Sequence, residues 1–437
     1  MAKNTHALAL VRAARGMTGV DLAREICAAA ERRGLRSGTT KQRIYKWEVD
    51  GVTPDRESQE YIAEVFGVPL ENVDVRSWPN WLPDAGVVPL GSASTMPALR
   101  EALRASMERS RRFVLSAISG TALTTLASTW ASADVRPQAT GRTQSKAVGE
   151  DLVVLLEETS ARLTSLATQE RQHTAPLIDA HLATVTDLIA DGRYSGSLGL
   201  RLHALAGILS QTVAWHRFDL GLYAEATRYW VAGLHSAHAV ADHDLGAAML
   251  SDLAYQASWR GDPATAAAIL QRALSRTVHP AAQSLLQLRL ARALAAQGER
   301  RTTLRALAAS EHLLGKASLE PKPTWCAWMS DADLAVDSGQ CLIELGDTGR
   351  AQSLIREGQD LLPTTRDKTR GVFLAYQASS FIDLSEPEQA AAAALESLEL
   401  AQRIGAPRCV QLVEDLIPRL ESFRDAQGVR ELLAHAA

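Results

Sequence analysis

Apolar residues recur every three or four positions along most of the chain, which is the period of an amphipathic α-helix. The first such segment, residues 5–16, places Leu8 and Val11 on one face and ends at Gly16, a residue type that commonly terminates helices. A second segment begins at Thr18, since threonine suits the N-cap position of a helix. The pattern therefore predicts two helices at the start of the chain.

A glycine-containing turn separates the second helix from a short, charged one. The second helix is expected to end near Arg33, and residues 34–39 (GLRSGT) are typical of a turn. Thr40 then stands at the N-cap of a third helix, and a fourth amphipathic helix ends at Gly67. A last turn at residues 69–73 closes a predicted five-helix bundle that occupies residues 1–73.

Residues 74–149 differ from the preceding segment in composition and pattern, and they are expected to form a linker. The segment WPNWLP at 78–83 predicts an extended strap, and residues 97–113 predict a basic amphipathic helix. Residues 134–146 are polar enough to be nearly disordered. For the stretch 97–130 two alternatives stay open, a packed hinge and a dimer interface.

From residue 150 to 437 the chain reads as successive amphipathic helices with an internal repeat. A small residue in one helix, a glycine in the following turn and a small residue early in the next helix return about five times. Because each helical hairpin leaves an apolar face that only its neighbours can bury, we expect a stacked superhelix with a concave inner surface. The markers of the five copies are Ala214, Gly221 and Ala226; Ala254, Gly261 and Ala266; Ala291, Gly298 and Thr303; Gly339, Gly346 and Ala351; and Ala378, Ser385 and Ala390.

Composition and charge support an all-α protein with a basic N-terminal segment. Apolar residues make up 46% of the chain, and the aromatic and β-branched residues that favour strands are sparse. Residues 1–47 hold ten Lys and Arg against three Asp and Glu, whereas the remainder holds 36 against 47. Clustered basic residues fit a nucleic-acid partner bound at one end. The four cysteines are far apart in sequence, so buried, reduced thiols are expected.

The short third helix carries the candidate base contacts. Gln42 can bond the edge of an adenine, while Lys41 and Lys46 can reach guanine acceptors or phosphates. The competing interpretation is a merely solvated, charged helix. The outward group comprises Thr40, Lys41, Gln42, Arg43, Tyr45 and Lys46, with Arg43 nearer phosphate or solvent, and the inward group comprises Ile44 and Trp47.

Three stretches carry a family resemblance: LVRAARGMTGVDLA, IYKWEVDGVTPDRE and YIAEVFGVP. With them, residues 7–72 resemble the lambda-repressor-like, or XRE, helix-turn-helix family. The resemblance implies DNA contacts from Lys41, Gln42, Tyr45 and Lys46, and an N-cap at Thr40. It also implies that Trp47 and Glu48 pack the helices together, and the apolar pattern adds Leu22 and Ile44 to this packing. The stretch 28–39 departs from the family because it lengthens the second helix and the turn.

The whole layout resembles XRE regulators of high-GC bacteria that carry tetratricopeptide (TPR)-like repeats, so the expected fold is a helix-turn-helix bundle linked to a TPR-like α-solenoid. This implies a DNA-binding transcriptional regulator whose repeats form a homodimer and sense a peptide, a small molecule or a protein. Gln256, Gln340 and Gln377 fall in first helices of repeats and are candidate ligand-facing residues. The alternative is a TPR scaffold or adaptor with a weakly specific DNA-binding head.

Other chemistry finds little support in the sequence. Residues 110–113 (SRRF) resemble a twin-arginine export motif, but they follow the predicted N-terminal bundle and precede a Ser/Thr-rich run. We therefore expect a cytoplasmic protein outside the membrane. His235, His238 and Asp242 could share a helical face and bind a metal, yet solvated histidines are commoner. No nucleophile with its base, paired carboxylates or phosphate loop stands out, so we expect no enzyme activity, cofactor or metal.

Overall fold

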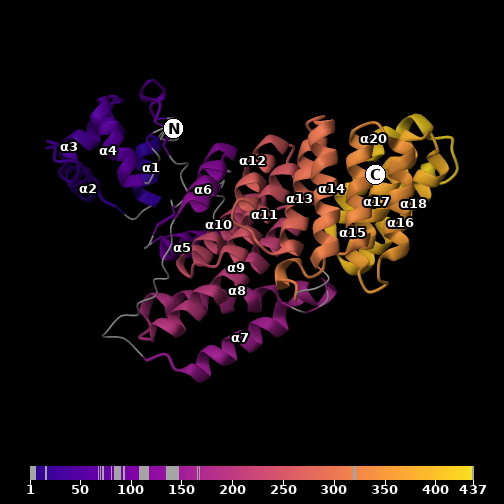
Figure 1. Ribbon diagram of the computed structural model, residues 1–437, viewed down its shortest axis with the longest axis horizontal. Coiled ribbons are helices and arrows are strands. Elements are labelled where there is room, and N and C mark those ends of the chain that lie inside the picture. Colours follow the sequence, from indigo (N-terminus) through magenta and orange to yellow (C-terminus); the bar gives the residue numbers. More distant parts are fainter. Residues whose placement is uncertain are drawn as a thin grey trace.

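The computed structural model is all-α, as the sequence predicts, and contains no strand within the residues that it describes. Figure 1 shows a small N-terminal bundle at one end and a longer array of helices beside it. The described residues are 6–14, 17–66, 68, 70, 73–79, 81–82, 90–91, 94–107, 118–133, 147–164, 166, 168–317 and 321–435.

The described residues of the N-terminal bundle, called the head below, form four α-helices and a short 3-10 helix close to the predicted positions. The predicted cap at Gly16, the end at Gly67 and most of the turn at 69–73 lie outside the described residues. The elements are α1 (Ala7–Ala14), α2 (Gly19–Arg32), α3 (Lys41–Glu48), α4 (Arg56–Phe66) and η2 (Val75–Ser77).

The head has its own apolar core, which the strap after η2 completes. Trp81 donates a hydrogen bond from Nε1 to Gln59 Oε1 at 3.0 Å, and its ring lies 5.5 Å from that of Trp78. Leu82 is buried against the same cluster. The start of the predicted strap therefore packs onto the bundle. The large core side chains are Leu8, Leu22, Ile26, Ile44, Trp47, Tyr61, Ile62 and Phe66.

Two helices from the segment predicted as a linker pack against the repeat array. They are α5 (Thr95–Met107) and α6 (Gly120–Ser132). Trp130 of α6 is buried beside Gly246, where even a Cβ would meet the indole at 2.4 Å. Arg276 donates to the carbonyl oxygen of Ala131 at 2.7 Å and so secures the end of α6. The remainder of the predicted helix at 97–113, the SRRF motif and residues 134–146 lie outside the described residues.

Five helical hairpins follow one another along the array, as the repeat pattern predicts. Their small-residue markers in both helices are buried, which lets the paired helices approach closely. The hairpins are α9 (Gly196–Asp219) with α10 (Tyr223–Ala239), α11 (His243–Trp259) with α12 (Pro263–Leu274), α13 (Pro280–Ala295) with α14 (Arg300–Lys316), α15 (Asp331–Glu344) with α16 (Thr348–Leu361), and α17 (Asp367–Asp383) with α18 (Pro387–Ile404).

The turn within each hairpin uses a left-handed backbone conformation. Gly221, Gly261, Gly298 and Gly346 have φ values of 74°, 77°, 75° and 79°. Glycine adopts this region without a steric penalty, which explains the recurring marker. In the last hairpin Ser385 takes the same position with φ 59°.

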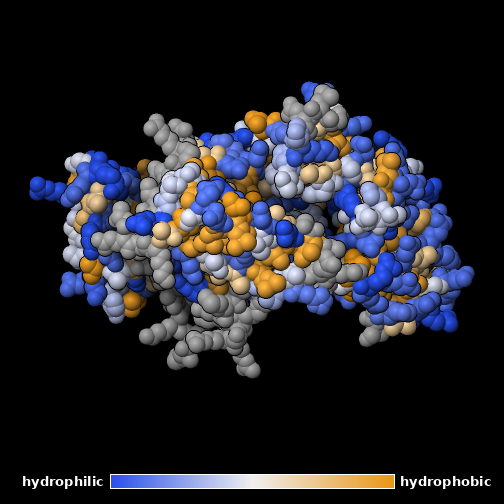
Figure 2. All heavy atoms as spheres, turned by 90° about the horizontal axis from the view of Figure 1, so that it is seen from below, coloured by the Kyte–Doolittle hydropathy of each residue, from blue (hydrophilic) through white to orange (hydrophobic). Residues whose placement is uncertain are grey.

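Further helices cover both ends of the array. Helices α7 (Glu150–Thr164) and α8 (Thr168–Asp191) form the lower side in Figure 1 and expose Leu152, Leu155 and Leu177. Figure 2 shows the molecule from below, with hydrophobic residues gathered around the middle of this face and a hollow beside the C-terminal part. None of the described helices is both long and apolar enough to cross a membrane. The covering elements are α7 (Glu150–Thr164), α8 (Thr168–Asp191), α19 (Pro407–Glu414), α20 (Ile417–Leu420), η6 (Glu421–Phe423) and α21 (Val429–His435).

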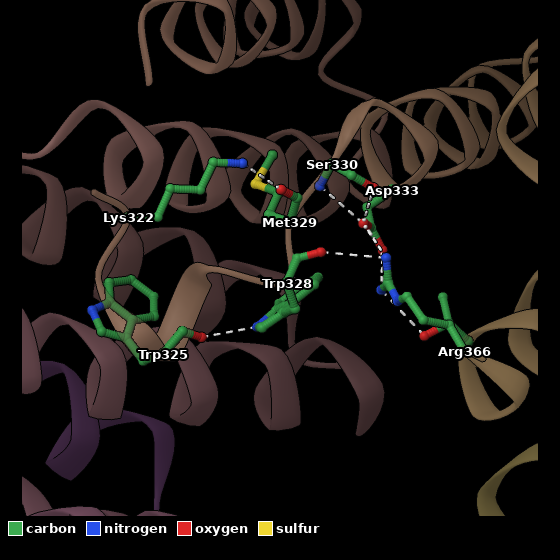
Figure 3. Close-up of polar contacts among 8 residues, drawn as sticks. Lys322, Trp325, Trp328, Met329, Ser330, Asp333 and Arg366 are labelled. Atoms are coloured by element: carbon green, nitrogen blue, oxygen red, sulfur yellow. Dashed lines mark hydrogen bonds and ion pairs between the residues drawn. The ribbon is translucent and has the colours of Figure 1, made fainter. Parts of the chain in front are cut away.

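An insertion between α14 and α15 accounts for the widest spacing between successive second-helix markers of the repeat, which is the spacing from Thr303 to Ala351. Its short helix η5 (Thr324–Cys326) lies against α11 and α13. Figure 3 shows how the insertion is held: Lys322 donates to the carbonyl oxygen of Met329 at 3.0 Å, and Arg366 makes two hydrogen bonds to Asp333 at 2.7 and 2.8 Å. Arg366 precedes α17 and Asp333 lies in α15, so this ion pair joins two successive hairpins. Arg366 also donates to the carbonyl oxygen of Trp328 in the insertion at 3.3 Å.

Candidate nucleic-acid interface

Local sequence sets both ends of α2. Thr18 and Asp21 form a capping box, in which Asp21 N donates to Thr18 Oγ1 at 3.2 Å and Thr18 N donates to Asp21 Oδ2 at 2.9 Å. The hydrogen bond from Thr18 lowers the pKa of the Asp21 carboxyl. At the other end, Gly34 adopts φ 72° and Leu35 N bonds to Ala30 O, which closes the helix with a Schellman motif.

The turn from α2 to α3 is held by polar contacts of its own. Ser37 and Thr39 share a hydrogen bond of 2.9 Å between their hydroxyl groups, and Thr39 is buried. Cys27 Sγ of α2 lies 3.3 Å from Ser37 O. The lengthened stretch therefore has a defined path that fixes where α3 begins.

Helix α3 is anchored on its inner side by packing and by an ion pair. Ile44 and Trp47 are buried in the head core, as predicted. Glu48 accepts two hydrogen bonds from Arg12 of α1, Nε to Oε1 at 2.6 Å and Nη2 to Oε2 at 2.9 Å. The bond to Glu48 raises the pKa of Arg12, so the guanidinium stays charged. This two-point contact limits rotation of α3.

The opposite side of α3 presents exposed polar side chains. Lys41, Gln42, Tyr45 and Lys46 are all exposed, and none makes a side-chain hydrogen bond or ion pair with the described residues. Tyr45 keeps 57% of its surface accessible. Four side chains with unused hydrogen-bonding capacity thus project from one rigid helix.

Most other basic residues of the head already have acidic partners. Arg33 pairs with Glu60 and Glu64 of α4, and Arg32 shares Glu64. Arg24 pairs with Asp21 on its own helix. The pairs of Arg32 and Arg33 tie α2 to α4, and all of these ion pairs reduce the positive charge that the head offers to a phosphate backbone.

Arg43 and Thr40 flank the exposed group. Arg43 pairs with Asp55 at 2.9 Å, and its guanidinium lies 5.9 Å from the Trp47 ring, so it has partners within the head. Thr40 occupies the predicted N-cap position, but its side chain makes no capping hydrogen bond. The first amides of α3 are thereby left open to an external acceptor.

Arg12 and Arg36 were missed by the sequence reasoning. Arg12 is the ion-pair partner of Glu48, and nothing in the local pattern connects two residues so far apart along the chain. Arg36 is exposed in the turn before α3 and has no side-chain partner among the described residues. The signal that could have identified Arg36 from the sequence is its position in the turn directly before the predicted third helix.

The three glutamines predicted to face a ligand lie in separate hairpins, each bonded within the array. Gln256 is buried and donates to Thr227 Oγ1 at 2.6 Å, and Gln377 accepts from Gln359 at 3.0 Å. Gln340 bonds to Glu344 one turn further along α15, where burial raises the carboxyl pKa and Arg292 and Gln340 act against it. Their role as ligand contacts stays a prediction.

The histidines weighed as a metal site have other surroundings. His235 is fully buried, and its Nδ1 lies 2.6 Å from the Ser94 hydroxyl in a hydrogen bond that docks the start of α5. Asp242 caps α11 by accepting from Leu245 N. Within the described part of the chain, no three His, Cys, Asp or Glu residues gather in a way that could hold a metal ion.

The geometry defines a class of molecule: a small helical bundle with one outward polar helix, carried by an array of helical hairpins. A family model described as the SP15 N-terminal domain matches residues 8–78. This match spans the helices of the head and the first tryptophan of the strap. No curated protein matches the chain.

Proposed function

We propose that this chain is a sequence-specific DNA-binding transcriptional regulator of the XRE type, with α3 as its recognition helix. The observation that carries the proposal is the outward group Lys41, Gln42, Tyr45 and Lys46. These side chains are exposed and have no partner in the described part of the chain, and their helix is anchored by Arg12 and Glu48. A helix of this kind fits the major groove, where side-chain donors can distinguish base pairs.

The start of α3 suits a phosphate. Its first amides have no side-chain cap from Thr40, and the positive end of a helix dipole favours an anion. Arg36 is close by in sequence and adds a positive charge that no described residue pairs with. Phosphate contacts here would set the position of the head, while Gln42 and the lysines read the bases.

For residues 150–437, called the body below, the array of hairpins supports a TPR-like repeat domain, and we propose that it dimerises and senses an effector in the cytoplasm. The effector class stays open among a peptide, a small molecule and a protein. A ligand that favours one shape of the body would alter the spacing of two heads on DNA. In this proposal the chain acts by binding, without catalysis, a cofactor or a metal.

The test is selection of DNA fragments by the full-length protein from a random pool, followed by affinity measurements on the enriched sequence. The triple variant Lys41→Ala, Gln42→Ala and Lys46→Ala should lose at least about 100-fold in affinity for that sequence, because each good base contact contributes about 1–3 kcal/mol of discrimination. The variant should also show a weaker salt dependence.

A matched control removes two positive charges from the body instead. Arg301 and Arg305 are exposed on α14, and their double alanine variant should bind the selected DNA as the wild type does. An unchanged affinity of the triple variant, with circular dichroism showing an intact fold, would refute α3 as the reader.

The second candidate is a scaffold, because stacked hairpins offer a large surface to protein partners. In that case the head would bind phosphates only, and affinity at fixed salt would not vary with sequence. The enriched pool tests this directly: no enrichment over the starting pool favours the scaffold.

A further inference from the structure

Side chains from the last helices of the array reach back to the first hairpins. In a simple array of repeats each unit contacts only its neighbours. Here Lys368 of α17 forms an ion pair with Asp219 at the end of α9, and Arg408 of α19 donates to the Tyr255 hydroxyl of α11 at 3.2 Å. These contacts therefore join the first hairpins of the array to its last helices.

The group that Arg408 enters is an aromatic box. Its guanidinium carbon lies 5.5 Å from the Phe218 ring, 5.7 Å from Tyr255, and 5.8 Å from both Trp215 and Trp259. These rings come from α9 and α11 and also contact one another edge to face or tilted. Only 12% of the Arg408 side chain is exposed.

A planar cation is the chemistry that this box recognises. Each ring within about 6 Å attracts a cation through its quadrupole, and the attraction strengthens when water is excluded. Asp219 Oδ1 lies 3.7 Å from Arg408 Nε and supplies the opposite charge. Tyr255 adds a hydroxyl acceptor, so aromatic faces, a carboxylate and a hydroxyl converge on one guanidinium.

The fit nevertheless leaves polar capacity unused. Arg408 Nε and Asp219 Oδ1 are both buried without a hydrogen-bond partner in the described residues. The backbones of α9 and α11 do not pack against α17 or α19 as neighbouring helices of a hairpin do, so the described contacts across the array come from side chains. Because side chains make this junction, we expect it to open without repacking the helices within any hairpin.

We propose that the aromatic box of Trp215, Phe218, Tyr255 and Trp259 is a guanidinium-binding site, that Arg408 is its resident occupant and holds the array closed, and that an arginine side chain of a peptide competes for it. The proposal concerns the body alone and is tested without DNA. Its failure would therefore leave the proposed DNA binding untouched.

The first measurement is binding of N-acetyl-arginine amide to the full-length protein. Arg408→Ala empties the box and should bind this probe at least about tenfold more tightly than the wild type, since a tenfold change corresponds to about 1.4 kcal/mol, within the range of a desolvated cation–π contact. Adding Asp219→Asn to Arg408→Ala should remove the gain. The matched probe N-acetyl-alanine amide should bind neither protein.

The second measurement is the shape of the protein by small-angle X-ray scattering. Arg408→Ala should increase the radius of gyration, and N-acetyl-arginine amide should reverse the increase. Arg419→Ala is the matched control, because Arg419 pairs with nearby Asp383 and does not reach the first hairpins. Equal probe affinity of Arg408→Ala and wild type, or an Arg408→Ala shape identical to that of Arg419→Ala, would overturn the proposal.

Discussion

Two arginines of the head, Arg12 and Arg43, have opposite surroundings although both pair with a carboxylate. Arg12 and Glu48 expose only 20% and 9% of their side chains, whereas Arg43 and Asp55 expose 45% and 56%. Water screens the second pair strongly and the first pair weakly. The structural contribution of the two pairs should therefore differ.

Arg12→Ala should loosen α3 by about 1–3 kcal/mol, because it leaves the Glu48 carboxylate in the interior without its partner. Arg43→Ala should change local stability by less than about 1 kcal/mol. Hydrogen exchange of the α1 and α3 amides in the full-length protein measures both. Equal protection in the two variants would show that the Arg12 pair does not anchor α3.

His203 of α9 makes the stability of the body depend on pH. Burial lowers its pKa from 6.5 to about 4. Between these two pH values the unfolded chain binds a proton at His203 that the folded chain does not bind. The free energy of unfolding therefore decreases as the pH falls from 6.5 towards 4. The loss should reach at most about 3 kcal/mol.

His203→Leu should reduce this decline, because leucine fills a similar space and cannot be protonated. The comparison is chemical denaturation of wild type and variant at pH 7 and pH 5, followed by far-ultraviolet circular dichroism. The difference between the two proteins should grow at the lower pH in favour of the variant. A difference independent of pH would contradict the assignment.

At the scale of elements, the hairpin turns offer a matched pair of substitutions. Ser385 stands at φ 59° where the other four copies have glycine, and a non-glycine residue is disfavoured in this region. Ser385→Gly should stabilise the α17–α18 hairpin by about 0.5–1 kcal/mol, and Gly346→Ser should destabilise α15–α16 by a similar amount.

Sterics do not complicate the second substitution, since a Cβ on Gly346 would meet no atom within 4 Å. Hydrogen exchange of the amides in each hairpin gives the two local stabilities separately. If neither substitution shifts protection, backbone conformation is not what selects glycine at these turns.

The order of helices was predictable because it depends on local patterns. Caps such as Thr18, the glycine turns and the buried alanines each leave a signal within a few residues. The contacts across the array were not predictable in the same way, because Asp219 and Lys368 are 149 residues apart and nothing in either segment specifies the other. Gln256 shows the same limit: its place in a first helix was visible, but its buried bond to Thr227 was not.

The candidate interface was predictable in part for a related reason. The helical period separates Ile44 and Trp47 from the outward side of α3, so the sequence could divide that helix into two faces. It could not tell which basic residues are neutralised by partners on other helices, as Arg33 is by Glu60 and Glu64. The total of ten basic residues overstated the charge available to DNA.

At the scale of the whole molecule, the proposed dimer makes a geometric prediction. The DNA selected by the full-length protein should contain two related half-sites, with centres about 34–36 Å apart or at a multiple of that distance. Sedimentation of the complex should give two chains per site. A single half-site bound by one chain would show that the protein does not bind DNA as a dimer, and it would leave α3 as the recognition helix.

The junction between Arg408 and the aromatic box also has a consequence for biosynthesis. Tyr255 leaves the ribosome 153 residues before Arg408, which at about 5–20 residues per second is a delay on the order of ten seconds. Throughout that interval the first hairpins can fold, but the four aromatic side chains of the box cannot yet contact the guanidinium of Arg408. The nascent chain therefore passes through a stage in which this cluster is open to chaperones and to other newly made chains, and its final residues end that exposure.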